Sequence, residues 1–234
     1  MTDKTGTSHP VLTFDCYGTL LDTSPFYDLI RSAAREAGID PSAAISVFCR
    51  WEDRLMYGEP YSDYDQILHK ALVWCDWQLG TDVFAKQYEQ AMEVHRNFRP
   101  FDEVISVLKK LKEKGVRICL MSNTTNELIR SHQKALEYLP DAWLSAQMVH
   151  CYKPDLRFFE LAEILWHLPE CLHIHAAKGY WWDMMPAKRT GWQSVWIDRS
   201  NEPLHPDLIP DAVISDLSQI FDVLPAGLLL SAIH

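Results

Sequence analysis

Apolar residues follow two kinds of pattern along the chain, and the two patterns divide it into regions. After a polar tail over residues 1–10, a short apolar run at residues 11–14 ends at Asp15 and predicts a buried strand. From Ser24 to about Arg99 the apolar residues recur every three or four positions, which predicts helices instead. Gly stops and Asp or Pro starts divide this region into four expected helices, over residues 25–37, 41–57, 63–79 and 82–95.

Beyond Pro100, strand-like and helix-like segments alternate. The pattern predicts strands at 116–121, 143–149, 172–176, 194–197 and 212–214, and helices at 101–114, 124–138, 155–166, 183–190 and 216–223. Such alternation is typical of parallel strands joined by helical crossovers. A single strand at residues 11–14 is not stable alone and must join this sheet. We therefore expect an α/β fold with a Rossmann-like, doubly wound parallel sheet, in which residues 1–23 and 100–234 form the core domain and residues 24–99 form an inserted helical bundle.

Composition and charge narrow the classes of partner. The chain has 234 residues, of which 47% are hydrophobic and 23% charged, so disorder is excluded. The formal net charge of −10 argues against nucleic acid or an anionic membrane as partner, because both need a basic surface. No apolar run approaches the length of about 18 residues that spans a bilayer. A small anionic substrate remains compatible with the charge, because one local cationic pocket is enough to bind it.

Several further features of the sequence bear on location, cofactors and assembly. The six cysteines are scattered without a C-x-x-C pair, and the first residues lack a signal-peptide pattern, so we expect reduced thiols and a cytoplasmic protein. The ten histidines show no metal-ligand spacing, and no P-loop or G-x-G-x-x-G occurs, so no metal and no cofactor are expected. The apolar character of the helical bundle and the Leu run at 228–230 suggest a homodimer.

Candidate chemistry gathers where the expected strands end. In an open parallel sheet, ligands bind outside the carboxyl ends of the strands. The residues that follow the first four of these ends include two carboxylates, two ammonium groups and several hydroxyl and amide groups: Asp15, Tyr17 and Thr19; Ser122 and Asn123; Lys153; and His175, Lys178, Tyr180 and Asp183. We expect these side chains to converge on one rim, with His175 packing or capping at the end of its strand.

Four short motifs carry a resemblance to a known family. The run Phe-Asp-Cys-Tyr-Gly-Thr-Leu-Leu-Asp at residues 14–22 resembles the first motif of the haloacid dehalogenase superfamily, in the form found in L-2-haloacid dehalogenases. Met-Ser-Asn at 121–123 and Lys-Pro-Asp at 153–155 are similar to its second and third motifs. Asp183, followed by Ala187 and Gly191, is similar to the fourth. The resemblance covers the whole expected α/β part, and the helical insertion stands where the family carries its cap domain.

This resemblance implies a role for each matching residue. Asp15 is the expected nucleophile, and an ester formed on it splits one hard step into two easier ones. Thr19 would orient the Asp15 carboxylate, and Lys153 would keep it ionised. Asp183 would orient the hydrolytic water. Ser122 would hold Asp15 or, with Asn123, bind a substrate carboxylate; ordinary turn and cap roles are the alternative for Thr19 and Ser122. Cys16, Tyr17, Tyr180 and Arg50 complete the expected substrate contacts, with Arg50 preferred over Arg54 in the insertion. Core or interface packing is the default interpretation for Trp51, Trp181 and Trp182, and an apolar wall around the substrate is the alternative.

Three positions decide between branches of the superfamily. Phosphatases of the superfamily carry a second Asp where this chain has Tyr17, and a phenol with a pKa of about 10 is a poor acid at neutral pH. Magnesium-dependent relatives carry an acidic residue where this chain has Lys178, so we expect the Lys178 ammonium to replace the metal and to pair with Asp183; a side chain directed to solvent is the alternative. The dehalogenases resemble Ser-Ser-Asn-x-x-Asp here, and this chain has Tyr180 in place of the Asn, where it donates to water or substrate or packs with the tryptophans.

The expected function is therefore a metal-independent hydrolase that displaces halide from a short 2-haloacid through an aspartyl ester. One rival uses the same residues to open a strained ring such as azetidine-2-carboxylate. A second rival is a magnesium-dependent phosphatase, and a third is a binding module without catalysis. The expected partner of the hydrolase is a small anionic organic acid.

Overall fold

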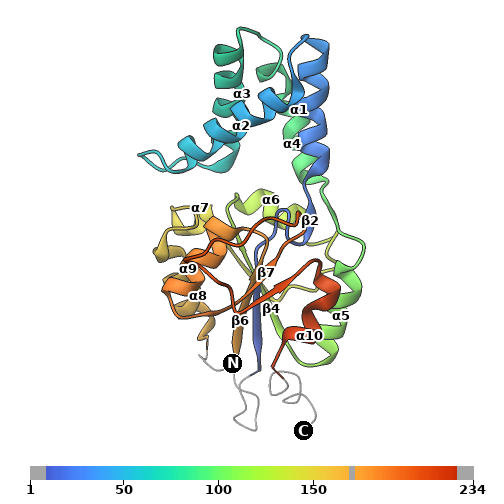
Figure 1. Ribbon diagram of the computed structural model, residues 1–234, viewed down its shortest axis with the longest axis vertical. Helices are drawn as coiled ribbons and strands as arrows, with labels where there is room; N and C mark the ends of the chain where they lie inside the picture. Colours follow the sequence, from blue (N-terminus) through green and yellow to red (C-terminus); the bar gives the residue numbers. More distant parts are fainter. Residues whose placement is uncertain (1–8, 169–171, 226–234) are drawn as a thin grey trace.

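The computed structural model describes residues 9–168 and 172–225, which form an α/β core beneath a bundle of helices (Figure 1). All six strands of the central sheet run parallel. Their order across the sheet is β5 (Ala142–Ser145), β4 (Arg117–Ser122), β1 (Val11–Phe14), β6 (His173–Ala177), β7 (Gln193–Ile197) and β8 (Ala212–Ile214). The first strand thus lies inside the sheet, between β4 and β6, and the expected α/β class is confirmed.

Helices cover both faces of this sheet, which explains why its strands are almost continuously apolar. All four residues of β1 are buried. On one face lie α5 (Val104–Glu113) and α10 (Ile220–Val223), the latter preceded by a 3-10 turn at Leu217–Gln219 (Figure 1). On the other face lie α8 (Leu156–Trp166) and α9 (Met185–Arg189). Two short helices, α6 (Asn126–Ser131) and α7 (Ala146–Val149), follow β4 and β5.

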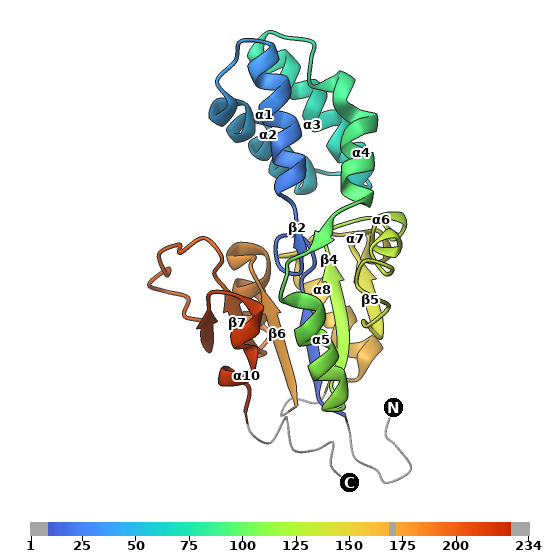
Figure 2. The same ribbon diagram turned by 90° about the vertical axis from the view of Figure 1, so that its right-hand side faces the viewer.

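The inserted helices stand together beyond the carboxyl ends of the strands (Figure 2). They are α1 (Ser24–Glu36), α2 (Pro41–Met56), α3 (Tyr64–Leu79) and α4 (Tyr88–Arg96), with a 3-10 turn at Ala85–Gln87 before α4. We refer to these four helices as the cap. An antiparallel pair, β2 (Leu21–Asp22) and β3 (Arg99–Pro100), joins the cap to the core. The sequence pattern did not predict this pair, because two residues per strand are too few to show a period.

Two predicted segments were wrong in type or extent, and each has a local cause. The strand expected at 143–149 ends at Ser145, whose hydroxyl accepts a hydrogen bond from Met148 N (3.2 Å) and so begins α7. The helix expected at 82–95 begins later, because the Asp76 carboxylate accepts hydrogen bonds from Phe84 N (3.0 Å) and Ala85 N (2.8 Å) and holds this turn outside the helix. Side-chain caps of this kind compete with regular structure and leave no periodic trace in the sequence.

Two further boundaries differ from the prediction. The helix expected at 124–138 is α6 alone, and the chain leaves it through Glu137 and Tyr138, both with positive φ. The helix expected at 183–190 is preceded by a π-helical turn at Tyr180–Met184. The Leu run at 228–230 lies outside the described residues. Within the described part of the chain, no helix combines the length and apolar character needed to cross a membrane.

Candidate active site

The first strand delivers Asp15 to the carboxyl edge of the sheet. Asp15 is 8% exposed and follows β1 directly, and the chain then turns at Gly18, which has a φ of 75°. This turn brings Thr19 back toward Asp15, and the Thr19 hydroxyl donates a hydrogen bond to Asp15 Oδ2 (2.6 Å). The same hydroxyl accepts a hydrogen bond from Lys178 N (2.9 Å), which fixes the direction of its proton. The expected orienting role of Thr19 therefore has a defined geometry.

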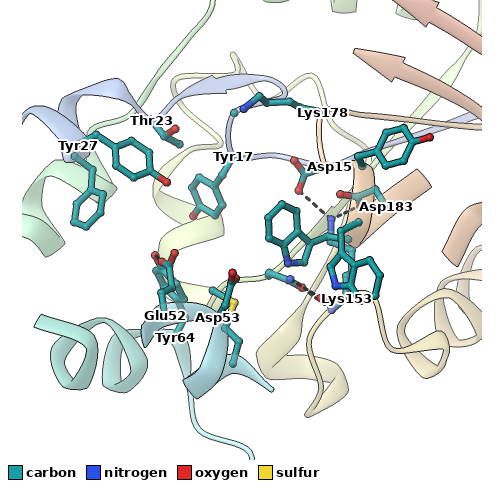
Figure 3. A pocket seen from close by; sticks show the side chains of 18 of the residues that line it. Asp15, Tyr17, Thr23, Tyr27, Glu52, Asp53, Tyr64, Lys153, Lys178 and Asp183 are labelled. Atoms are coloured by element: carbon teal, nitrogen blue, oxygen red, sulfur yellow. Dashed lines mark hydrogen bonds and ion pairs between the residues drawn. The ribbon is translucent and has the colours of Figure 1, made fainter. Parts of the chain in front are cut away.

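The loop before α8 places a buried ammonium between two carboxylates. Lys153 is 1% exposed, and its Nζ lies 2.9 Å from Asp15 Oδ1 and 2.5 Å from Asp183 Oδ1. Nζ also donates to the carbonyl oxygen of Met121 (2.9 Å). All three contacts of this ammonium are acceptors, so its charge is fully hydrogen-bonded despite burial. Dashed lines in Figure 3 mark its two contacts with Asp15 and Asp183.

Asn123 holds this lysine in place. Its Oδ1 accepts a hydrogen bond from Lys153 N (2.7 Å), and its Nδ2 donates to Lys153 O (3.0 Å). Both ends of the amide are therefore engaged with the backbone of Lys153. Asn123 also lines the cavity described below, so its contact with a substrate carboxylate stays a prediction. Ser122 is fully buried in β4, and its hydroxyl has no hydrogen-bond partner among the described residues, so the expected bond to Asp15 is absent there.

Burial and charge act on the three central groups in different directions. Burial raises the pKa of Asp15, the Lys153 ammonium lowers it, and the Asp183 charge raises it, with a net rise. For Asp183, burial is outweighed by Lys153 and by a hydrogen bond from His175, so its pKa lies below the usual range. The two carboxylates raise the pKa of Lys153 against the effect of burial. The site therefore keeps its ammonium charged and its second carboxylate ionised.

A cavity of about 480 Å³ separates these residues from the cap. Figure 3 shows Asp15, Lys153 and Asp183 on one side, with Glu52, Asp53 and Tyr64 on the cap side. The Tyr64 hydroxyl donates to Glu52 Oε1 (2.7 Å), and burial raises the pKa of Glu52 to about 7. The remaining lining side chains are mostly aromatic or apolar and include Tyr17, Phe26, Tyr27, Met56, Phe98, Trp181 and Trp182. The cavity can hold a small organic molecule against Asp15 while limiting its contact with water.

Comparison with known proteins now defines the family. Residues 10–174, which are more than half of the chain, match the sequence model of the haloacid dehalogenase-like hydrolases. The chain belongs to this family. An (S)-2-haloacid dehalogenase from Pseudomonas sp. (strain YL) is 29% identical over 195 residues, which cover 81% of this chain and 82% of that protein.

Solved structures of haloacid dehalogenases share the fold of the whole chain. The crystal structure of an L-2-haloacid dehalogenase superposes with a TM-score of 0.82 at 22% identity, over 92% of this chain and 98% of that one. The L-2-haloacid dehalogenase of Xanthobacter autotrophicus with chloropropionic acid covalently bound gives a TM-score of 0.74 at 16% identity, over 91% and 97% of the two chains. These likenesses confirm the fold that the four motifs implied.

The structure places Lys178 differently from the expectation for this haloacid dehalogenase-like hydrolase. Its side chain lies in the cavity wall over Gly18, and its ammonium points away from Asp183 (Figure 3). Asp183 is paired instead with Lys153. Lys178 has no ion-pair partner in the described ranges, so its charge remains available to a ligand. Nor do the described histidine, cysteine and acidic residues include a group of three or more suited to a metal ion.

Three other predicted site residues have contacts that the sequence did not reveal. Tyr17 lines the cavity, while its hydroxyl lies 3.1 Å from Thr124 Oγ1 and 3.1 Å from His132 Nε2. Tyr180 also lines the cavity, packs edge-on against Trp196 with ring centroids 4.9 Å apart, and donates to the Leu208 carbonyl. Cys16 is fully buried beneath the site and does not line the cavity, and burial raises the pKa of its thiol. The expected substrate contact of Cys16 is therefore corrected to core packing.

The expected cap cation is also absent from the cavity wall. Arg50 is exposed on α2 and does not line the cavity, whereas Glu52, Asp53 and Met56 of the same helix do. Each residue turns the helix by about 100°, so an error of two or three positions moves a side chain to another face. Arg54 lies over the Trp51 ring, 4.9 Å from its centroid. The sequence feature that could have identified Glu52 and Asp53 as cavity residues is their position on the apolar face of α2, next to Phe48 and Met56.

Proposed function

We propose that this haloacid dehalogenase-like hydrolase removes halide from short 2-haloacids by way of an ester on Asp15. The observation that carries the proposal is the way in which hydrogen bonds hold the Asp15 carboxylate at the floor of the cavity. One carboxylate oxygen accepts a hydrogen bond from Thr19 and the other from Lys153, so the group is oriented toward the space where a substrate would lie. The position two residues later is Tyr17, which supplies no carboxylic acid.

In the first step, an Asp15 oxygen forms a bond to C2 of the substrate as the carbon–halogen bond breaks. The halide leaves with the bonding electrons and needs no proton, which fits Tyr17 in place of an acid. Lys178 carries the cation that would bind the substrate carboxylate, because it lies in the wall of the cavity with its charge unpaired by described residues. The aromatic wall around the cavity limits competing attack by water.

In the second step, water adds to the Asp15 carbonyl carbon and transfers a proton to Asp183. The bond between that carbon and the substrate oxygen then breaks, and the proton passes to the departing 2-hydroxyacid. Asp183 can accept this proton because Lys153 and His175 keep its pKa below the usual range, so the carboxylate is ionised in the resting site. Lys153, in contact with both carboxylates, stabilises the negative charge that develops on the former carbonyl oxygen of Asp15.

The rival reactions have less support. Relatives matched by the chain include (S)-2-haloacid dehalogenases and a haloacetate dehalogenase of Moraxella sp. (strain B), which favours halide over a ring nitrogen or a phosphate ester as the leaving group. A magnesium ion between Asp15 and Asp183 would compete with the Lys153 ammonium that already contacts both.

We also propose that the protein works in the cytoplasm as a homodimer. Exposed tryptophans on α3, Trp74 and Trp77, support an apolar contact surface.

A substrate panel tests this proposal. Purified protein is given 2-chloropropionate, azetidine-2-carboxylate and p-nitrophenyl phosphate, each with added magnesium and with a chelator. Chloride and 2-hydroxyacid should appear in equal amounts with or without the chelator. Asp15→Asn should abolish release, while Asp222→Asn, an exposed carboxylate on α10, should leave it unchanged. Phosphate release that needs magnesium, or chloride release that survives in fresh Asp15→Asn protein, would overturn the proposal.

A further inference from the structure

Beneath the cavity, a chain of buried polar side chains leads from Asp183 into the core. His175 Nε2 lies 3.1 Å from Asp183 Oδ1, and His175 Nδ1 lies 2.8 Å from Thr13 Oγ1. Thr13 Oγ1 lies 2.9 Å from His173 Nε2. Thr13 and His175 are fully buried, and His173 is 3% exposed. Such a set of polar groups inside a sheet is costly unless every donor meets an acceptor, so its arrangement can be worked out.

The positions of the protons in this series of hydrogen bonds follow from its Asp183 end. An ionised Asp183 only accepts hydrogen bonds, so His175 Nε2 carries the proton that it donates. In a neutral ring Nδ1 is then the acceptor, and the Thr13 hydroxyl donates to it. With its proton used, Thr13 Oγ1 accepts from His173 Nε2. Burial, together with the neighbouring His175, lowers the pKa of His173 to about 3, so the His173 ring is neutral. This orientation satisfies each contact in the series and has His175 donating to Asp183.

The chain of contacts leaves the two oxygens of Asp183 in different states. Oδ1 accepts from Lys153 Nζ (2.5 Å) and from His175. Oδ2 receives no hydrogen bond from any residue of the described ranges, and it lies so near Gly179 that a Cβ there would approach it to 2.3 Å. Asp183 also lines the cavity. Its Oδ2 is therefore the oxygen with lone pairs free to take a proton from water.

We propose that His175, oriented by Thr13, is a positioning residue for the hydrolysis of the Asp15 ester. By holding Oδ1, it keeps the Asp183 carboxylate in the rotation that presents Oδ2 to the water in the cavity. In that step Oδ2 takes a proton from water, the water oxygen bonds to Cγ of Asp15, and the bond from Cγ to the substrate oxygen breaks. This inference rests on the proposed ester on Asp15, and it goes beyond the expectation that His175 packs or caps at the end of its strand.

The geometry also says which half of the reaction His175 serves. Asp15 is held by Thr19 and Lys153, and neither contacts His175. Lys153 has the Met121 carbonyl as a further fixed partner. Loss of the His175 hydrogen bond therefore leaves the nucleophile and its cation in place, while the carboxylate that serves the water loses one of its two anchors. Ester formation should continue, and ester hydrolysis should slow.

The experiment resolves the two steps with 2-chloropropionate. Acid-quenched samples are weighed by intact-protein mass spectrometry to follow the ester on Asp15, and chloride is measured in parallel. In His175→Phe and Thr13→Val the ester should accumulate, with hydrolysis slowed at least about tenfold, while the first chloride burst changes less than about threefold. His175→Gln, whose amide can donate to Asp183, and Thr13→Ser, which keeps the hydroxyl, should recover most of the hydrolysis rate.

A matched control and distinct failures keep the test sharp. Ser194 is a buried hydroxyl in register with His175 on β7, and it bonds to Asp211 rather than to Asp183, so Ser194→Ala should leave both steps unchanged. Thermal melts show which variants are folded, and the Thr13 pair stands in if His175→Phe is not. If the ester forms but folded His175→Phe and Thr13→Val hydrolyse it at the wild-type rate, His175 is not a positioning residue. If no protein in the series forms an ester, the proposed function itself fails.

Discussion

Replacement of Lys153 by methionine removes the one ammonium that contacts both buried carboxylates and keeps a side chain of similar length. At the separations of 2.9 and 2.5 Å to Asp15 and Asp183, an effective dielectric constant of about 20 gives an attraction of ~6 kcal/mol for each pair. Desolvation of the three charges offsets much of this. Removal of one partner from a buried pair costs about 3–5 kcal/mol, because the charge left behind is uncompensated. We expect a loss of that size in the free energy of unfolding.

The pH dependence of this loss has a definite sign. Without Lys153, burial and mutual repulsion raise the pKa values of both carboxylates in the folded variant above their unfolded values. The folded variant then binds more protons than the unfolded chain, so its stability rises as the pH falls. The difference from wild type should be largest at and above neutral pH and should shrink on acidification. Activity should be lost as well, because Asp15 is protonated at low pH and lacks the orienting hydrogen bond from Lys153 at every pH.

Urea denaturation of Lys153→Met and wild type at several pH values measures the effect. The control is Lys86→Met, which breaks an exposed pair with Asp82 whose side chains are 66% and 81% exposed; such a pair contributes at most about 1 kcal/mol. If Lys153→Met loses no more stability than Lys86→Met, or loses more at low pH than at neutral pH, the account of this ammonium is wrong.

Three further changes probe other parts of the site. Thr19→Val removes the hydrogen bond to Asp15 Oδ2 without changing the shape of the side chain. The rate of ester formation should therefore fall about 10- to 100-fold and should return in Thr19→Ser. An unchanged rate of ester formation would contradict the orienting role of Thr19. Gly179→Ala places a Cβ 2.3 Å from Asp183 Oδ2 and so displaces this oxygen; ester hydrolysis should then fall at least about tenfold while folded protein still forms the ester. Wild-type hydrolysis would show that Oδ2 does not serve the water. Because the pKa of Glu52 is about 7, this carboxylate becomes charged above neutral pH and repels an anionic substrate. KM for 2-chloropropionate should therefore rise between about pH 6 and about pH 8 in wild type and stay flat in Glu52→Gln. A parallel rise in both proteins would refute this repulsion.

The sequence predicted the core half of the site because local rules place it. Parallel strands end at one edge of a sheet, so Asp15, Lys153 and Asp183 had to meet there, and the turn at Gly18 returns Thr19 to Asp15. The motifs that gave these residues lie in the segments that follow strand ends, where a boundary error of one or two residues does not change the edge. This part of the prediction therefore did not depend on how the helices pack.

The cap half depended on such packing and was missed. Which face of α2 meets the cavity is set by contacts of that helix with the rest of the cap, and a prediction based on Arg50 fails when the true face carries Glu52 and Asp53. The sequence also did not show which charged side chains pair with each other inside the core. The sequence places two cations, Lys153 and Lys178, at the same rim as Asp183, and only the three-dimensional path of each side chain shows that Lys153 is the partner. The link from His175 to Thr13 joins residues 162 positions apart, which no local pattern records.

The central claim is that Asp15 bonds to carbon and that water later attacks the aspartyl carbonyl. A single turnover in water enriched in heavy oxygen, with enzyme in excess over 2-chloropropionate, tests it most directly. The account predicts that the label enters the peptide containing Asp15 and that the first 2-hydroxyacid formed carries ordinary oxygen. Label in that first product, with none in the peptide, would mean that water attacks the substrate itself and that Asp15 forms no ester.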